Sequence, residues 1–295
     1  MTQFADLHTH STASDGQYSP RELVGLAKRS GIQILALTDH DTLDGIPEAI
    51  AAGEEQGLTV LRGVELGAAE HKNLHLLGYG FSHSAPCLSA LCQTMRSSRD
   101  ARKYRIIDFL RERGVIISLD EVEELAGNAV IARPHFAQVM VRHGYVSTNR
   151  EAFDRYLDTD EYQKIERFKA SARDCIAAIR ADGGHAALAH PYQLGLDDER
   201  LEALIHQLKD SGLEAIECFY PRHTPEQTAF YLDLARRYDL HVTGGSDFHG
   251  ERVKPDIALK RWELNLTWLL NEKMVRHEGH TALGVDRFAK YTKTN

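Results

Sequence analysis

The sequence has few cysteines, no long apolar run and no excess of positive charge. Its four cysteines form no C-x-x-C pair, which favours reduced thiols. No stretch approaches the ~18 consecutive apolar residues of a membrane span, and the first residues are neither basic nor apolar. Lys and Arg number 35 against 43 Asp and Glu, a formal net charge of −8, which argues against general nucleic-acid binding. We expect a reduced, cytoplasmic protein that neither enters a membrane nor wraps duplex DNA.

Two common catalytic signatures are also missing. There is no G-x-x-x-x-G-K-[ST] phosphate cradle and no G-x-S-x-G nucleophile turn. The sequence therefore supports neither a nucleoside triphosphatase nor a Ser-triad hydrolase.

Short β-branched runs alternate with longer helix-like stretches, the pattern of βα units around a parallel sheet or barrel. Strands are predicted at Phe4–His8, Ile34–Thr38, Leu58–Glu65, Asn73–Gly80, His185–His190, Leu213–Phe219 and His241–Ser246. Helices are predicted at Ser19–Ser30, Gly45–Gln56, Ala170–Ala181, Asp197–Ser211 and Thr224–Tyr238. The fold class predicted is α/β, a distorted (β/α)7 TIM-like barrel.

The alternation stops in the middle of the chain. From 88 to 169 no strong strand run is present and helical periodicity dominates. We interpret 88–169 as a helical insertion domain, with 1–87 and 170–295 forming the barrel. No function is assigned to 262–295.

Histidine is unusually abundant, with 16 in 295 residues, and many lie at the ends of predicted strands beside acidic residues. Barrel enzymes place their active sites at the carboxyl ends of the strands. Imidazole and carboxylate together suit divalent ions such as Mn, Fe or Zn. The candidate ligands are His8, His10, Asp15, His40, Glu65, His75, His190, Asp247 and His249. Nine ligands are too many for one ion, so the sequence predicts two or three divalent metals per chain.

Three neighbouring carboxylates, Asp6, Asp39 and Asp41, are either additional ligands or groups that orient the ligand imidazoles. The remaining histidines are interpreted as ordinary surface or core residues; they are His71, His83, His143, His185, His206, His241, His277 and His280.

The ordered motifs H-x-H, a following Asp, D-H-D, G-x-E, a strand His, A-H-P and S-D-x-H run from Asp6 to His249. This set resembles the polymerase and histidinol phosphatase family, known as PHP. Within that family, the chain length, the helical insertion and the segment Arg133-Pro134-His135-Phe136 resemble bacterial nucleoside 3′,5′-bisphosphate phosphatases, some of which are also 5′–3′ exoribonucleases.

The resemblance implies a seven-stranded barrel with three metals, often manganese. It implies one ion held by His8, His10, Glu65 and Asp247, a second by Asp15, His40 and His249, and a third by Glu65, His75 and His190. Glu65 would bridge two ions. The residues expected to act most directly in catalysis are Asp15, Glu65, His190 and His249.

The residues that indicate the kind of substrate lie in the predicted insertion. Residues 96–113 contain seven basic residues against three acidic ones, in a chain that is net negative. Such a face can hold a phosphate that is not cleaved, because arginine offers a planar bidentate fork. The candidate substrate residues are Arg99, Arg102, Lys103, Arg133, Pro134, His135 and, after the sixth strand, His223.

We expect a metal-dependent phosphatase that converts a small nucleoside 3′,5′-bisphosphate, such as 3′-phosphoadenosine 5′-phosphate, into the 5′-monophosphate. Metal ions about 3.5–4 Å apart can polarise a phosphoryl oxygen and neutralise the leaving oxygen. The alternatives are 5′–3′ trimming of short RNA from its 5′ end, a histidinol-phosphate phosphatase, and a non-catalytic metal-binding module. The sequence indicates neither the oligomeric state nor the preferred base.

Overall fold

The computed structural model describes residues 2–127, 131–165 and 168–270. The chain divides into two compact units, one made of Met1–Gln93 with Lys169–Asn295 and the other of Thr94–Phe168. The predicted insertion boundaries, 88 and 169, lie near this division. Helix α3, at Pro86–Glu112, begins in the first unit and continues into the second.

The first unit is built on one eight-stranded sheet in the order β7-β6-β5-β4-β3-β2-β1-β8. The strands are β1 (Thr2–Thr9), β2 (Ile34–Leu37), β3 (Thr59–Gly67), β4 (His75–Tyr79), β5 (His185–Leu188), β6 (Ala215–Phe219), β7 (His241–Gly244) and β8 (Trp262–Asn265). Strands form where the seven β-branched runs predicted them, whereas β8 was not predicted.

The sheet curls until β7 approaches β1. The Asp247 backbone N–H donates to the His8 carbonyl over 2.8 Å, and the His10 N–H donates to the Phe248 carbonyl over 2.9 Å. These bonds join the segment after β7 to the end of β1. The predicted distorted barrel is therefore confirmed.

Strand β4 departs from the parallel pattern, since it runs antiparallel to both β3 and β5. A parallel crossover needs about a dozen residues or more, and only residues 68–74 connect β3 to β4. The reversal brings the start of β4 to the edge where the other strands end, because His75 pairs with Gly67.

Strand β8 lies antiparallel to β1, beside the gap between β1 and β7. Its first residue, Trp262, stacks on Phe219 of β6 with ring centroids 5.6 Å apart. No strand was predicted at the residues of β8, which lie in the segment 262–295. His277 and His280 lie outside the described residues.

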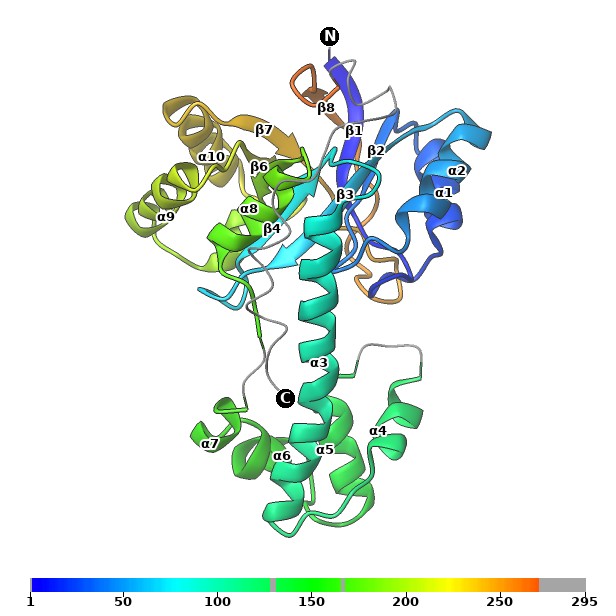
Figure 1. The fold of residues 1–295 in the computed structure, drawn as a ribbon, viewed down its shortest axis with the longest axis vertical. Coiled ribbons are helices and arrows are strands. Elements are labelled where there is room, and N and C mark those ends of the chain that lie inside the picture. The colour runs from blue at the N-terminus through cyan, green and yellow to red at the C-terminus, as the bar shows by residue number, and fades with distance from the viewer. Residues whose placement is uncertain (1, 128–130, 166–167, 271–295) are drawn as a thin grey trace. The chain divides into compact units, whose positions relative to one another are not determined.

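Helices cover the outside of this barrel, with α1 and α2 on one flank and α9 and α10 on the other (Figure 1). They are α1 (Pro20–Arg29), α2 (Ile46–Gln56), α8 (Ala172–Ala181), α9 (Asp198–Asp210) and α10 (Pro225–Arg237), with the short 3₁₀ helix η2 (Pro191–Leu194) after β5. Helix α1 begins with a capping box, because Ser19 and Glu22 each accept the other's backbone N–H. Its apolar residues Leu23 and Ala27 pack in one core with Leu35 of β2. The five predicted barrel helices are confirmed.

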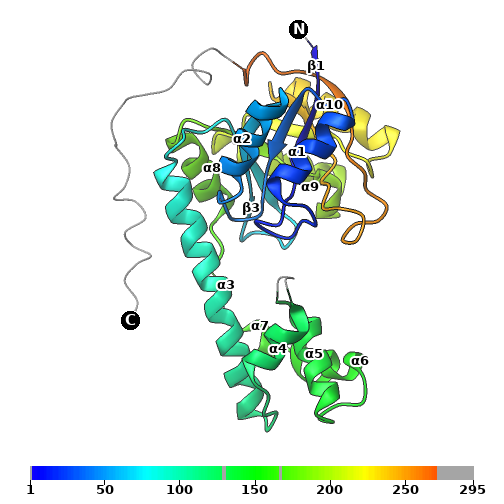
Figure 2. The same cartoon turned by 90° about the vertical axis from the view of Figure 1, so that its right-hand side faces the viewer.

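The second unit is a small helical bundle, in which the shorter helices gather around the C-terminal part of α3 (Figure 2). These are α4 (Leu119–Ala126), α5 (Arg133–Arg142), α6 (Asn149–Ala152), the π-helical turn η1 (Phe153–Leu157) and α7 (Asp160–Gln163). Their core includes Leu110, Phe136, Met140, Leu157 and Tyr162, all buried. The unit thus has its own apolar centre.

Within the described ranges, no helix combines the length and the apolar character that crossing a bilayer requires.

Candidate metal centre

The first pair of candidate ligands sits at the end of β1. Between Asp6 and Thr9, β1 contains one more residue than the facing segment of β2, so the register shifts there. Such bulges re-aim side chains beside functional sites. His8 lies within this irregular stretch and His10 just after it, with ring centroids 5.2 Å apart. Both imidazoles are buried.

Glu65, near the end of β3, is the hub of the cluster, and its carboxylate is fully buried. Its Oε2 atom lies 3.1 Å from His8 Nε2, 3.2 Å from His10 Nε2 and 3.2 Å from His40 Nδ1. His40 comes from the loop after β2. One carboxylate oxygen is therefore within reach of three imidazole nitrogens, which come from the carboxyl ends of β1 and β2.

The other oxygen of Glu65 faces two more imidazoles. Oε1 lies 2.7 Å from His75 Nδ1 and 2.9 Å from His190 Nε2. His75 reaches this point because β4 is reversed, and His190 comes directly after β5. The two Glu65 oxygens thus face different sets of ligands, as a carboxylate bridging two ions would.

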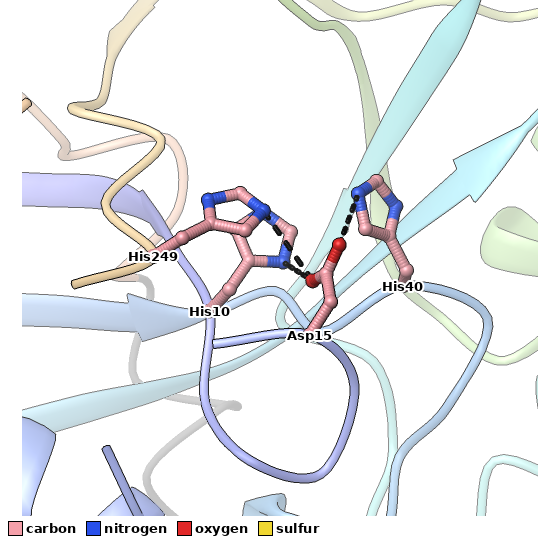
Figure 3. Close-up of side chains that lie close together, drawn as sticks. All are labelled: His10, Asp15, His40 and His249. Carbon is pink, nitrogen blue, oxygen red and sulfur yellow. Dashed lines mark ion pairs between the residues drawn. The ribbon is translucent and has the colours of Figure 1, made fainter. Parts of the chain in front are cut away.

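A second corner of the cluster is formed by Asp15, from the loop after β1 (Figure 3). Its carboxylate lies 3.3 Å from His249 Nε2, 3.7 Å from His10 Nδ1 and 4.0 Å from His40 Nε2. The Asp15 side chain is 36% exposed, His40 24% and His75 22%, whereas His8, His10 and Glu65 are at most 1% exposed. The cluster is therefore open to solvent on the side of Asp15, His40 and His75.

The ligand atoms fall into three overlapping groups, each with its atoms within 4.8 Å of one another. The groups are His8, His10, Glu65 and Asp247; His10, Asp15, His40 and His249; and His40, Glu65 and His75. The first contains the residues implied for one ion. The second adds His10 to the implied set, and the third has His40 where the resemblance implied His190.

Whether the cluster suits metal ions can be judged from its buried polar atoms. His8 Nε2, His10 Nε2 and Glu65 Oε2 are buried, and none has a hydrogen bond of acceptable geometry in the described part of the chain. Buried polar atoms normally have a partner. Imidazole nitrogens and carboxylate oxygens are the donors that divalent transition ions prefer. These residues fit divalent metal ions.

Charge in the cluster is balanced between imidazoles and carboxylates. Burial lowers the pKa of His10, but the nearby carboxylates of Asp247, Glu65 and Asp15 outweigh it and raise that pKa to about 9. Burial likewise raises the pKa of Glu65, yet the surrounding imidazoles hold it well below its usual range. Burial, in contrast, lowers the pKa of His40 to about 3. Without metal, a proton therefore occupies His10 but not His40, so ions and protons compete for the His10 imidazole.

Asp39 and Asp6, which the sequence left undecided between ligands and orienting groups, hold the surrounding loops in place. Asp39 accepts hydrogen bonds from the Ser11 N–H over 2.8 Å and from the Ser14 hydroxyl over 2.6 Å, which fixes the loop that carries Asp15. Asp6 accepts from the Ser246 N–H over 2.8 Å, and burial raises the pKa of Asp6 to about 6. Neither belongs to a ligand group.

Backbone strain accompanies the cluster. His190 and Asp247 have φ angles of 25° and 57°, in the left-handed region that non-glycine residues rarely adopt. Strained residues of this kind gather at functional sites, where the surrounding structure holds them in place.

Sequence reasoning missed three residues that support the cluster. Glu217 of β6, fully buried, accepts a bond from the His190 N–H over 2.7 Å and lies 3.2 Å from His8 Nδ1, so it orients His8. Tyr220 and Lys254 both contact Asp247. An acidic residue inside an apolar strand run was the available signal for Glu217. Tyr220 and Lys254 lie in loops and gave none.

The predicted substrate residues of the insertion make contacts within the second unit. Arg102 donates to the Ile165 carbonyl over 3.2 Å, and its guanidinium lies 5.3 Å from the Tyr162 ring centre. Arg133 is paired with Asp158 at 2.9 Å. Each guanidinium has five N–H donors, so donors remain for a phosphate.

Three further predicted residues also have partners. Lys103 pairs with Asp100 at 3.1 Å. His135 Nδ1 accepts the Ala132 N–H over 3.0 Å at the start of α5, where Pro134 occupies the first turn. A proline there suits the helix start because it lacks an N–H.

His223 is enclosed by aromatic rings of the barrel unit. Its Nδ1 donates to the Cys218 carbonyl over 3.0 Å, and its ring centre is 5.2 Å from that of Tyr220 and 4.8 Å from that of Tyr231. Burial lowers the pKa of His223. A neutral imidazole in this setting offers less attraction to phosphate than the sequence alone indicated.

The sequence model of the PHP domain family matches residues 6–179. Among characterised proteins, a 5′-3′ exoribonuclease of Haemophilus influenzae is 36% identical over 84% of this chain and 91% of its own length. A phosphoribosyl 1,2-cyclic phosphate 1,2-diphosphodiesterase of Eggerthella lenta is 34% identical over 83% and 94%. A 3′,5′-nucleoside bisphosphate phosphatase of Chromobacterium violaceum is 32% identical over 83% and 86%.

A solved structure shares the fold. It is an amidohydrolase from Chromobacterium violaceum with bound sulfate and no metal, 30% identical, with a TM-score of 0.70 over 88% of this chain and 92% of its own.

Proposed function

The chain belongs to the PHP domain family, and we propose that it is a metal-dependent phosphatase that removes the 3′-phosphate from nucleoside 3′,5′-bisphosphates. The product is the nucleoside 5′-monophosphate. The observation that carries the proposal is the cluster around Glu65, whose two oxygens face five imidazoles from four segments of the barrel. The active-site residues proposed are Asp15, Glu65, His190 and His249, with the nine candidate ligands as the metal-binding set.

Divalent ions held by this cluster would supply Lewis-acid charge for a phosphoryl group and lower the pKa of water at the site. We favour manganese, with iron or zinc as alternatives, and two or three ions per chain. The chain's own residues orient the candidate ligands and keep water out of the buried side of the cluster. Glu217 fixes the direction of His8, Asp39 fixes the loop of Asp15, and the buried side of the cluster keeps water away from Glu65.

The exposure of the candidate ligands supports an entrance for the substrate on one side of the cluster. Substrate approaches the cluster over Asp15, His40 and His75, since these candidate ligands are partly exposed and the others are buried. The phosphate that is cleaved would lie at this open edge.

The second phosphate distinguishes a bisphosphate from a simple ester. We assign its recognition to Arg99, Arg102, Lys103, Arg133, Pro134 and His135 of the second unit, with His223 of the barrel unit as a further contact. Four of these residues, Arg99, Arg102, Lys103 and Arg133, are cationic in a chain of net charge −8. A charge-assisted contact to phosphate is worth about 1.5–3 kcal/mol.

Arg102→Ala is expected to lower kcat/KM for a 3′,5′-bisphosphate by roughly tenfold to a hundredfold. The same variant should change turnover of p-nitrophenyl phosphate little, because that ester has no second phosphate. Steady-state kinetics on both substrates measure the difference. Equal losses would mean that Arg102 supports the fold through Tyr162 and Ile165 and does not select the substrate.

A 5′–3′ exoribonuclease is the second candidate, favoured by the 36% identity to an enzyme of that name. Both activities would use the same metal centre. The two activities differ in the group that is attached to the reacting phosphate through the cleaved bond. In the phosphatase reaction this group is a mononucleotide, and in the exoribonuclease reaction it is an RNA chain.

One assay separates the candidates. The metal-reconstituted protein is incubated with 3′,5′-bisphosphates, nucleoside monophosphates, short 5′-phosphorylated RNA, phosphoribosyl 1,2-cyclic phosphate and histidinol phosphate, and products are quantified. The proposal expects the highest kcat/KM with the bisphosphates. Preference for RNA would make the protein an exoribonuclease, preference for the cyclic phosphate or for histidinol phosphate would assign that activity, and no turnover would indicate a metal-binding module.

The cytoplasm is the compartment we propose. Cys87, Cys92, Cys175 and Cys218 are all buried, and none of them forms a disulfide with another. Reduced thiols are typical of that compartment.

A further inference from the structure

Lys254 lies in the loop after β7, and it touches a candidate metal ligand from outside the cluster. Its Nζ atom is 2.7 Å from Asp247 Oδ2. The Tyr220 hydroxyl donates to the same oxygen over 3.0 Å. The other oxygen of Asp247, Oδ1, faces the cluster, 3.3 Å from His10 Nε2 and 3.5 Å from His8 Nε2. The Asp247 carboxylate therefore lies between the lysine ammonium and the imidazoles of His8 and His10.

The loop holds Lys254 in place. The Lys254 N–H donates to the Gly250 carbonyl over 2.9 Å, and the Arg252 N–H donates to Gln17 Oε1 over 2.8 Å. Gly250 has a φ of +96°, and a Cβ there would lie 2.4 Å from the Gln17 side chain. The turn thus depends on a glycine, and it presents the lysine beside Asp247.

The ammonium has donors to spare. A lysine has three N–H donors and no acceptor, and Asp247 takes one of them. The Lys254 side chain is 30% exposed, whereas that of Asp247 is 3% exposed. The remaining donors can therefore meet a ligand that enters from solvent.

The charges around the Lys254 ammonium indicate the chemistry of that ligand. When Asp247 shares its negative charge with a cation, an ammonium beside it faces like charge and is stabilised by an added anion. A phosphoryl group next to the ligand groups supplies that anion. We propose that Lys254 binds an oxygen of the phosphoryl group at the metal centre, as a substrate-binding residue of the barrel unit. This inference rests on the proposed function.

The role differs from that of the arginines in the second unit. Those residues are assigned to the phosphate that stays, so their loss affects bisphosphates only. Lys254 contacts the phosphate that reacts, so its loss affects every phosphoester and inorganic phosphate as well.

The test measures inorganic phosphate binding to the manganese-loaded protein by calorimetry, with metal content determined on the same samples. Lys254→Met should retain its metal and weaken phosphate binding about tenfold to a hundredfold. Lys254→Arg should recover part of the affinity, because it keeps the charge. The matched control is Lys260→Met, a lysine of the same loop whose ammonium lies 5.7 Å from the Trp262 ring centre, and it should bind phosphate normally.

Tyr220→Phe distinguishes phosphate contact from support of Asp247. It removes the other donor to Asp247 Oδ2 and leaves the ammonium, so phosphate affinity should persist. Unchanged phosphate binding in Lys254→Met would overturn the inference, and so would loss of metal from that variant, since Lys254 would then act through Asp247. Because binding is measured without turnover, a protein that hydrolyses none of the phosphoesters offered refutes the proposed function while the phosphate titration still decides the role of Lys254.

Discussion

Glu65→Gln is expected to lose more than one metal ion per chain and to lower phosphoester turnover by roughly three decades or more. The reason is the position of the carboxylate. Its two oxygens face different groups of imidazoles, with Oε2 at 3.1 Å from His8 and Oε1 at 2.7 Å from His75. An amide has no negative charge and only one acceptor oxygen, so it cannot bridge two cations. Metal analysis and kinetics on the purified variant measure both effects.

His206→Gln is the matched control for that variant. His206 lies on α9, 65% exposed, and pairs with Asp210 at 3.4 Å, away from the cluster. Metal content and turnover should equal those of the unmodified protein. Full metal content and full turnover in Glu65→Gln would show that Glu65 bridges nothing.

Gly245→Ala is expected to combine a loss of stability with a loss of metal. Gly245 follows β7, and a Cβ at this position would lie 2.2 Å from the Cβ of His8 and 2.7 Å from Glu217 Oε1. Atoms cannot approach so closely, so β1 or the loop after β7 must shift. Overpacking of this kind costs about 1–3 kcal/mol of the free energy of unfolding. The shift also separates His8 from Glu217, which orients it.

Chemical denaturation and metal analysis together test this expectation. Gly25→Ala is the comparison, because in helix α1 the added methyl meets only the end of Arg29 at 3.3 Å and Gln56 at 3.6 Å. Alanine in a helix interior is favoured over glycine by roughly 0.5–1 kcal/mol, so that variant should be at least as stable as the parent. A Gly245→Ala protein with normal stability and normal metal content would show that the cluster tolerates movement of His8.

The barrel was predictable because its strands carry local signals. Alternating β-branched runs identified β1 to β7, and a capping serine with proline and glutamate identified the start of α1. The reversal of β4 was not predicted, because the alternation of strands and helices indicated a parallel sheet throughout. The reversal follows from the short connection at 68–74 between β3 and β4. That reversal also explains how His75, at the start of its strand, joins ligands at the ends of others.

The grouping of the candidate ligands was predictable where they follow strands, whereas the residues that support them from elsewhere were not. His190 and Asp247 stand out by residue type, but their left-handed backbones are imposed by neighbouring segments and leave no local pattern. The bulges in β1 and β6 arise from strand pairing, so the alternation of residues could not reveal them. Lys254 reaches Asp247 from a loop seven residues later, and only the folded chain brings them together.

The most direct test of the metal centre is elemental analysis of the protein after purification without chelator, repeated after incubation with manganese. The cluster contains three overlapping ligand groups, and we expect two or three divalent ions per chain, lost in Glu65→Gln and retained in His206→Gln. A protein that is free of metal and takes up no manganese, iron or zinc at micromolar concentrations would contradict the account.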